Sequence, residues 1–189
     1  LASSNTEAAY FVAEARFLRA YAYLQLMDMY ANVPLVTKVT SELPAQSNRQ
    51  EIFTFVESEL EEISNSLPDS RSNEYGRVDK VAAWALLSRL YLNAPVYIGS
   101  NMSSQVIANA EKVISSSYSI NTSDGNGNGS AYDELFLADN NVNGAQNEFI
   151  FVVQFDGLNS QTWGGGTFMV HAPIGGTMDA SIFGVNGGW

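Results

Sequence analysis

A single large aromatic residue, Trp163, stands among glycines and small polar residues in the sequence Gln-Thr-Trp-Gly-Gly-Gly-Thr-Phe. An exposed aromatic ring can stack on the apolar C–H face of a sugar ring, while nearby amides and carboxylates bind the hydroxyl groups. On the same reasoning Tyr132 and Trp189 are weaker candidates for ligand binding. The competing interpretation is a loop tryptophan packed against the core, and the residues leave both readings open.

A second pattern, Asp-Gly-Asn-Gly-Asn-Gly, is typical of the first half of a calcium-binding loop. It places oxygen ligands at alternate positions, on Asp124, Asn126 and Asn128, and a glycine at the sixth position. The second half of the pattern fails, because position twelve is Leu135 and Glu134 falls one residue short. We therefore predict Asp124, Asn126 and Asn128 as candidate calcium ligands, with a flexible polar linker as the alternative.

The residues give little support for catalysis. The only histidine, His171, has no recognisable nucleophile motif beside it, and a lone histidine is more often structural. Acidic residues such as Asp133, Asp139 and Asp156 have no defined separation in the sequence, although glycoside hydrolysis requires a pair of carboxylates at a set distance. We predict that the protein is not an enzyme, and a glycoside hydrolase is the third alternative.

The composition excludes several other classes. The net charge is -11, and all nine lysines and arginines lie at or before Lys112, so nucleic acid is not an expected partner. There is no cysteine, and no run approaches the roughly 18 apolar residues of a membrane helix. The chain starts at Leu1 without an initiator or signal segment and stops after a Gly-Gly-Trp sequence. We expect it to be a piece of a longer protein, called the parent protein below.

Four helices are predicted from capping residues and apolar periodicity. Ser4, Asn48 and Asp79 are the expected N-caps of the first three. With their caps, the predicted helices cover residues 4–30, 48–67, 79–93 and 104–116.

The apolar residues of the predicted helices define their expected buried faces. The first helix has two such faces, so we expect it to be buried on more than one side. On the third helix, Trp84 stands among alanines and leucines and is expected in the core. The faces of the first helix are Phe17, Tyr21, Leu24 and Phe11, Ala15, Leu18, Ala22, Met29, and the expected solvent side of the second is Glu57, Glu59, Glu61, Glu62.

The sequence Tyr-x-Asn-x-Pro occurs at the end of the first helix and again 61 residues later, at Tyr30 and Tyr91. This degenerate repeat predicts a mainly α fold of tetratricopeptide-like helical hairpins, a class that usually serves as a binding scaffold. From Asn121 onward the chain is rich in loop residues, with a short helix expected at 132–138 and a short strand at 148–155. We predict a helical scaffold at 1–118 and a loop-rich ligand-binding segment at 119–189.

Four segments, taken together, resemble the SusD/RagB family. They are residues 13–36, 75–92, 148–151 and 184–189, in the order that the family shows, and one departure is Ala31-Asn32, where relatives often carry glycine. The resemblance implies a non-catalytic glycan-binding protein that is lipid-anchored on the extracellular face of an outer membrane. It implies a SusC-like TonB-dependent transporter as partner and an anchor outside this chain.

The resemblance also implies a ligand and a role for Trp163. Starch-binding members contact the glucan with an arc of aromatic side chains, and Trp163 is the position that we assign to it. Starch or maltooligosaccharide is therefore the favoured ligand among polysaccharides and oligosaccharides. The alternative function is a tetratricopeptide-like protein-interaction scaffold that binds no sugar.

Overall fold

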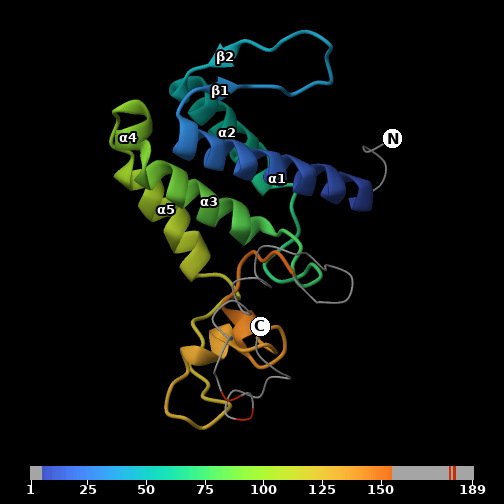
Figure 1. The fold of residues 1–189 in the computed structure, drawn as a ribbon, viewed down its shortest axis with the longest axis vertical. Helices are drawn as coiled ribbons and strands as arrows, with labels where there is room; N and C mark the ends of the chain where they lie inside the picture. The colour runs from blue at the N-terminus through green and yellow to red at the C-terminus, as the bar shows by residue number, and fades with distance from the viewer. Residues whose placement is uncertain (1–5, 155–178, 180, 182–189) are drawn as a thin grey trace. The chain divides into compact units, whose positions relative to one another are not determined.

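The computed structural model describes residues 6–154, 179 and 181, and these are mainly helical (Figure 1). By its contacts the chain divides into two units, Leu1–Val152 and Val153–Trp189, and the account below concerns the first. The predicted boundary between residues 118 and 119 stays a prediction. None of the helices in the described ranges has the length and apolar character needed to span a membrane.

Five α-helices, one two-stranded sheet and two short 3-10 helices make up the described elements. Helix α1 packs on α2, α2 on α3, and α3 on α5, which gives two helical pairs, α1 with α2 and α3 with α5. The predicted mainly α fold of paired helices is confirmed. The elements in chain order are α1 (Thr6–Tyr30), β1 (Val33–Pro34), β2 (Gln46–Ser47), α2 (Arg49–Ser64), α3 (Lys80–Leu92), α4 (Ala94–Ile98), α5 (Ser103–Ile114), η2 (Asp133–Phe136) and η3 (Ala145–Asn147).

The predicted caps at the starts of α2 and α3 are confirmed. The Asn48 side chain accepts the backbone N–H of Glu51 at 3.0 Å, and the Glu51 carboxylate accepts the N–H of Asn48 at 2.9 Å. This reciprocal pair satisfies two N–H groups that a helix start leaves without partners. At α3 the Asp79 carboxylate accepts the N–H of Val81 and that of Ala82. The predicted cap at Ser4 lies outside the described residues.

The two Tyr-x-Asn-x-Pro sequences lead into different structures. After α1, Ala31 has a φ of 62°, the left-handed conformation in which glycine carries no steric cost. The chain then enters β1, where Val33 pairs with Ser47 in an antiparallel ladder. After α3, Pro95 instead lies in the first turn of the short helix α4, which the sequence did not predict. Proline is tolerated at both sites although it has no backbone N–H. Pro34 lies in an edge strand, and Pro95 lies in the first helical turn, where an N–H has no partner within the helix.

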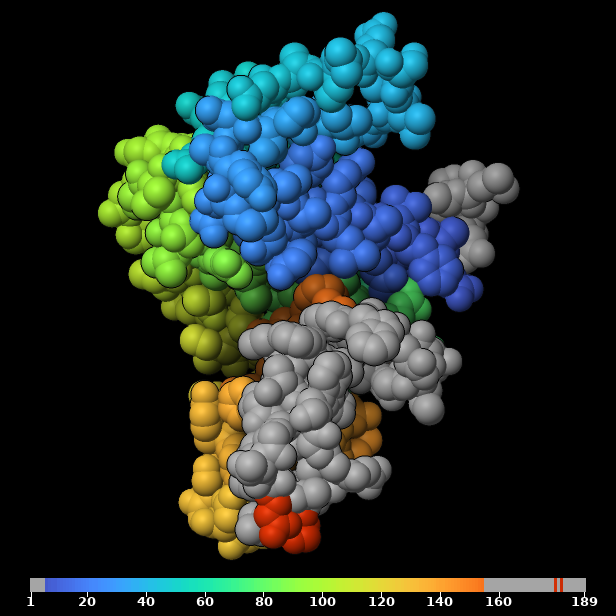
Figure 2. Space-filling model, viewed as in Figure 1, coloured from blue at the N-terminus to red at the C-terminus, as the bar shows by residue number. Residues whose placement is uncertain are grey.

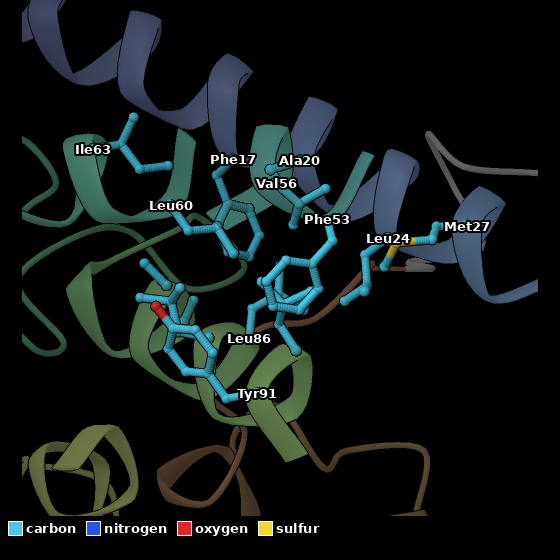
Figure 3. Packing of buried hydrophobic residues seen from close by; sticks show 14 of the residues in the cluster. Phe17, Ala20, Leu24, Met27, Phe53, Val56, Leu60, Ile63, Leu86 and Tyr91 are labelled. Atoms are coloured by element: carbon cyan, nitrogen blue, oxygen red, sulfur yellow. The ribbon is translucent and has the colours of Figure 1, made fainter. Parts of the chain in front are cut away.

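The core of the unit lies between α1, α2 and α3, and Figure 3 shows part of it from close by. One face of α1 contributes residues spaced alternately by four and three positions, as a helix seam requires. The tyrosine at the end of α3, Tyr91, is buried there. Trp84 is only half-buried, with the Lys112 ammonium 5.7 Å from its ring centroid, so its predicted core position is wrong. The buried α1 residues are Ala13, Phe17, Ala20, Leu24 and Met27.

The predicted solvent side of α2 is wrong at Glu59, which is only 8% exposed. Its carboxylate accepts two hydrogen bonds from Arg16, at 2.7 and 3.1 Å, and one from Arg19 at 2.5 Å. Burial acts to raise the pKa of Glu59, but the hydrogen bonds from Arg16 and Arg19 outweigh it and hold that pKa below its usual value. The sequence signal that was missed is the Arg-x-x-Arg spacing on the facing helix, which places both arginines on one side.

Two further expectations are wrong for the described residues. The second apolar face of α1 is exposed, with Leu18 and Met29 at 50% and 63%. Residues 148–154 form no strand, because Phe151 packs directly on α1 instead of in a ladder. Its ring centroid lies 5.3 Å from that of Phe17 and 6.0 Å from that of Tyr21.

Replacing Glu59 by glutamine in the parent protein tests the link between α1 and α2. We expect a loss of about 2 kcal/mol in the free energy of unfolding, measured by urea denaturation. A broken buried pair costs about 3–5 kcal/mol, and the two arginines are partly screened by solvent. The matched control is Glu62→Gln, which removes the exposed Arg16–Glu62 pair and should cost under about 1 kcal/mol. Equal losses in the two variants would contradict this account.

The same variant has a defined pH signature. Because the pKa of Glu59 is lower in the folded chain than the ordinary 4.5, the unfolded chain binds more protons between those two values. The stabilisation is therefore complete above about pH 4.5 and is lost as the pH falls through the folded-state pKa. The difference in stability between the wild type and Glu59→Gln should shrink over that acidic range.

Candidate functional site

Tyr132 is the one predicted ligand-binding residue within the described ranges, since Trp163 and Trp189 lie outside them. It directly precedes η2, and its ring is paired with that of Phe136 at a centroid distance of 5.2 Å and an interplanar angle of 64°. Both side chains are 70% exposed. The structure therefore shows two adjacent aromatic rings on the surface, called the aromatic pair below. The predicted helix at 132–138 is confirmed in shortened form as η2.

Buried Glu134 anchors the short helix η2, next to which Tyr132 lies and in which Phe136 lies. It is buried, and its carboxylate accepts the backbone N–H of Asn126 at 2.8 Å and the side-chain amide of Asn143 at 3.1 Å. The same Asn143 amide also donates to the backbone carbonyl of Glu134 at 3.0 Å. These bonds fix η2 between two loops, so Tyr132 and Phe136 project from an anchored turn. Nothing in the sequence indicated this anchoring role.

The predicted calcium loop is closed by its own hydrogen bonds. The two oxygens of Asp124 accept the backbone N–H groups of Asn128 and Gly129, at 3.1 and 2.7 Å. Asp133 accepts the side-chain amides of Asn128 and Asn126. The hydrogen bond from Asn128 is the main reason that the pKa of Asp133 lies below its usual value.

Among the described residues there is no group of three or more histidines, cysteines or acids that could hold a metal ion. The predicted calcium ligands are the carboxylate of Asp124 and the amide oxygens of Asn126 and Asn128. Because asparagines are not among the residue types of such groups, this finding does not test the predicted set. Calcium at these three residues therefore stays a prediction.

The surroundings of the aromatic pair suit a shallow sugar site. Asp133, next to Tyr132 in the chain, binds the amide groups of Asn126 and Asn128, so polar donors lie close to an exposed ring. Aromatic faces provide apolar contact area, and amides provide hydrogen bonds to hydroxyl groups.

A separate cavity of about 100 Å³ lies where the segment before α3 meets residues 146–152. It is lined by Arg71, Asn73, Glu74, Tyr75, Gly76, Arg77, Asp79, Tyr118, Gln146, Phe149, Ile150 and Val152. Pockets for small-molecule ligands are usually about 300–1,000 Å³. The cavity is therefore too small for a glycan, and we interpret it as part of a structural junction.

Asp79 is the centre of that junction. One carboxylate oxygen caps α3, and the other accepts the backbone N–H of Arg71 and the hydroxyl of Tyr118, both at 2.8 Å. Burial, and then this hydrogen bond to Asp79, raise the pKa of the Tyr118 hydroxyl well above its usual range. The sequence predicted the cap but gave no signal for Tyr118, 39 positions away. Through this bond the residue that directly precedes the predicted loop-rich segment is tied to the start of α3.

Comparison with known proteins relates this chain to a family of glycan-binding proteins. Residues 2–92 match a family model described as "Starch-binding associating with outer membrane". The starch-binding protein SusD of Bacteroides thetaiotaomicron is 37% identical over 159 residues, which are 84% of this chain and 27% of that protein. The chain therefore belongs to the SusD-like family, whose members bind glycans and are not catalysts.

Solved structures agree with this assignment. A SusD-like protein from Bacteroides fragilis matches with a TM-score of 0.64 and 29% identity, over 80% of this chain and 28% of its own. A laminarin-binding SusD-like protein matches with a TM-score of 0.61 and 28% identity, over 75% of this chain and 30% of its own. The chain thus spans little more than a quarter of the length of these relatives.

Replacing Asp79 by alanine in the parent protein tests the junction. We expect a loss of about 3 kcal/mol in the free energy of unfolding, because the helix cap is lost and the Arg71 N–H and the Tyr118 hydroxyl lose their bonds to the carboxylate. Tyr118→Phe removes only one of these bonds and should cost about 1 kcal/mol. Urea denaturation measures both values, and a loss for Asp79→Ala no larger than that for Tyr118→Phe would contradict the proposed role.

Proposed function

We propose that the parent protein captures a glycan at the cell surface and delivers it to a TonB-dependent outer-membrane transporter of the SusC type. In this proposal it binds without catalysis and is held on the extracellular face by a lipid anchor outside this chain. The observation that carries the proposal is the 37% identity to the starch-binding protein SusD over 84% of the chain. Starch, or a maltooligosaccharide derived from it, is accordingly the proposed ligand.

The aromatic pair is the proposed contact surface within the described residues. Tyr132 and Phe136 present two exposed rings on an anchored turn, and Trp163, which lies outside the described residues, stays a separate proposed stacking residue. Shallow platforms of this kind bury little of the ligand, so the affinity of each site should be modest. Binding at several points along a polymer raises the overall affinity through a high effective concentration.

The choice of sugar rests on the degree of similarity. One relative at 28% identity is described as laminarin-binding, so related scaffolds carry sites for other glucans. The higher identity to SusD favours the α-linked glucan. A direct comparison of the two polymers therefore decides the ligand class.

A second candidate function is a protein-interaction scaffold that binds no sugar. The loop between β1 and β2 favours it, because Val39 and Leu43 are fully exposed apolar residues in a connecting loop. Exposed apolar side chains that gather in one loop often mark contact with another protein. The two functions differ in ligand and share the same fold.

Affinity electrophoresis of the parent protein separates these functions. We expect gels that contain amylopectin to retard the protein, and gels that contain laminarin, dextran or xylan to leave it unretarded. Tyr132→Ala and Trp163→Ala should each weaken the apparent affinity on the order of 10-fold, since each removes a stacking ring. The matched control is Tyr30→Ala, which removes a comparably exposed tyrosine from α1 and should change nothing.

Each other outcome has a defined meaning. If amylopectin still retards both variants, the protein binds α-glucan as proposed, but neither Tyr132 nor Trp163 is part of the binding site. Retardation by laminarin alone replaces the α-glucan by a β-glucan. If no polysaccharide retards the protein, the glycan function is wrong and the scaffold function takes its place.

A further inference from the structure

The loop between α5 and η2 exposes two asparagines that each precede a glycine. Asn126 and Asn128 lie within residues 122–129, and every residue of that run is exposed. In Figure 2 part of the segment between α5 and η3, coloured yellow to orange, lies at the surface. An asparagine before glycine can react with its own backbone, because glycine has no side chain to shield the peptide nitrogen that follows the asparagine. The chain contains four such sequences, at Asn126, Asn128, Asn143 and Asn186, and the last lies outside the described residues.

The peptide nitrogen that follows Asn126 is open to reaction. Among the described residues, no group accepts a hydrogen bond from the backbone N–H of Gly127. A Cβ added at Gly127 would meet no heavy atom within 4 Å, so solvent reaches this nitrogen. Gly127 has a φ of 72°, in the left-handed region that glycine adopts without steric cost.

The side chain of Asn126 is held in a way that favours attack on its amide carbon. Its Oδ1 accepts the backbone N–H of Asn128 at 3.0 Å. This hydrogen bond draws electron density from Cγ and stabilises the negative charge that develops on Oδ1 when a nucleophile adds. The amide nitrogen, which has to leave, donates only to Asp133, at 3.3 Å, which is long for a hydrogen bond of this kind.

The corresponding groups at Asn128 are restrained. The N–H of Gly129, which would be the nucleophile, donates to the Asp124 carboxylate at 2.7 Å. The Asn128 amide donates to Asp133 in a closer contact than the Asn126 amide does. A nitrogen that is bound to a carboxylate reacts only when that hydrogen bond opens.

The groups at Asn143 are restrained more strongly. The N–H of Gly144 donates to the side-chain oxygen of Gln146 at 2.7 Å. The Asn143 amide donates to the carbonyl and to the carboxylate of Glu134, at 3.0 and 3.1 Å. Asn143 is also partly buried. The fold therefore distinguishes three Asn-Gly sequences that the amino-acid sequence alone leaves equivalent.

We propose that Asn126 is a site of spontaneous deamidation. The Gly127 nitrogen gives its proton to solvent and forms a bond to Cγ of Asn126. The Cγ–Nδ2 bond then breaks, and the amide nitrogen takes a proton from solvent and leaves as ammonia. Water opens the resulting cyclic succinimide at either carbonyl, which gives aspartate or isoaspartate. The reaction requires only water and does not depend on which ligand the parent protein binds.

The product remodels the loop beside the aromatic pair. The new carboxylate at position 126 replaces an amide that donates to Asp133, so two negative charges face each other. Isoaspartate also inserts a methylene group into the backbone, directly before the two N–H groups that Asp124 accepts. The N–H of Asn126 precedes the inserted group, so its bond to Glu134 and the anchor of η2 should remain.

Peptide mass spectrometry of the folded parent protein after incubation at mildly alkaline pH tests the proposal. It measures aspartate and isoaspartate at Asn126, with Asn128 and Asn143 as matched controls within the same molecule. Asn126 should be modified about 10-fold faster than either control, because the controls react only after hydrogen bonds open. In guanidinium chloride the three rates should become similar, since unfolding removes these restraints.

A variant tests the cause of the difference. Asp124→Ala removes the acceptor of the Gly129 N–H, so the rate at Asn128 should rise toward that at Asn126, while the rate at Asn143 stays unchanged.

Three results would overturn the proposal. One is modification of either control as fast as Asn126 in the folded protein. Another is the same order and ratio of rates in guanidinium chloride, which would mean that the sequence and not the fold selects the site. The third is an Asn128 rate that Asp124→Ala leaves unchanged, because the hydrogen bonds would then give no protection.

Discussion

The carboxylate of Asp79 is the point on which the arrangement of the described unit depends. It is fully buried, caps α3, and binds both the turn at Arg71 and the hydroxyl of Tyr118. Without that acceptor, the buried N–H of Val81 at the start of α3 would lose its partner, and the Tyr118 hydroxyl would keep only its 3.4 Å bond to the carbonyl of Ile150. The start of α3, the turn at Arg71 and the residues that follow α5 therefore share one hydrogen-bond centre.

Features set by local rules were predicted from the sequence, and features set by distant partners were not. The caps at Asn48 and Asp79 and the four main helices follow from side chains within four positions of each other. The burial of Glu59 depends on two arginines that lie 40 and 43 positions away. Residues 148–154 alternate like a strand, but strand pairing needs a neighbour, and the Phe151 ring meets α1 instead.

In the candidate site, too, the local feature was predicted from the sequence and the long-range contacts were not. Tyr132 was identified because a surface tyrosine in a polar segment suits sugar stacking, and the structure adds Phe136 beside it. The anchoring role of Glu134 could not be predicted from its neighbours in the sequence. Its carboxylate accepts hydrogen bonds from Asn126 and Asn143, which lie eight positions before it and nine positions after it. A rigid anchor under exposed rings is what a surface platform requires, since preorganised side chains lose less entropy on binding. Family membership and site geometry thus support glycan capture on separate grounds.

Calorimetric titration of the purified parent protein with maltoheptaose tests this central claim most directly, because it needs neither a transporter nor a polymer. The account predicts saturable binding of modest affinity, weaker binding of a shorter maltooligosaccharide, and no comparable heat with a laminarin oligosaccharide. Absence of binding to maltoheptaose and to every other oligosaccharide in the panel, by a protein that is folded by circular dichroism, would contradict it.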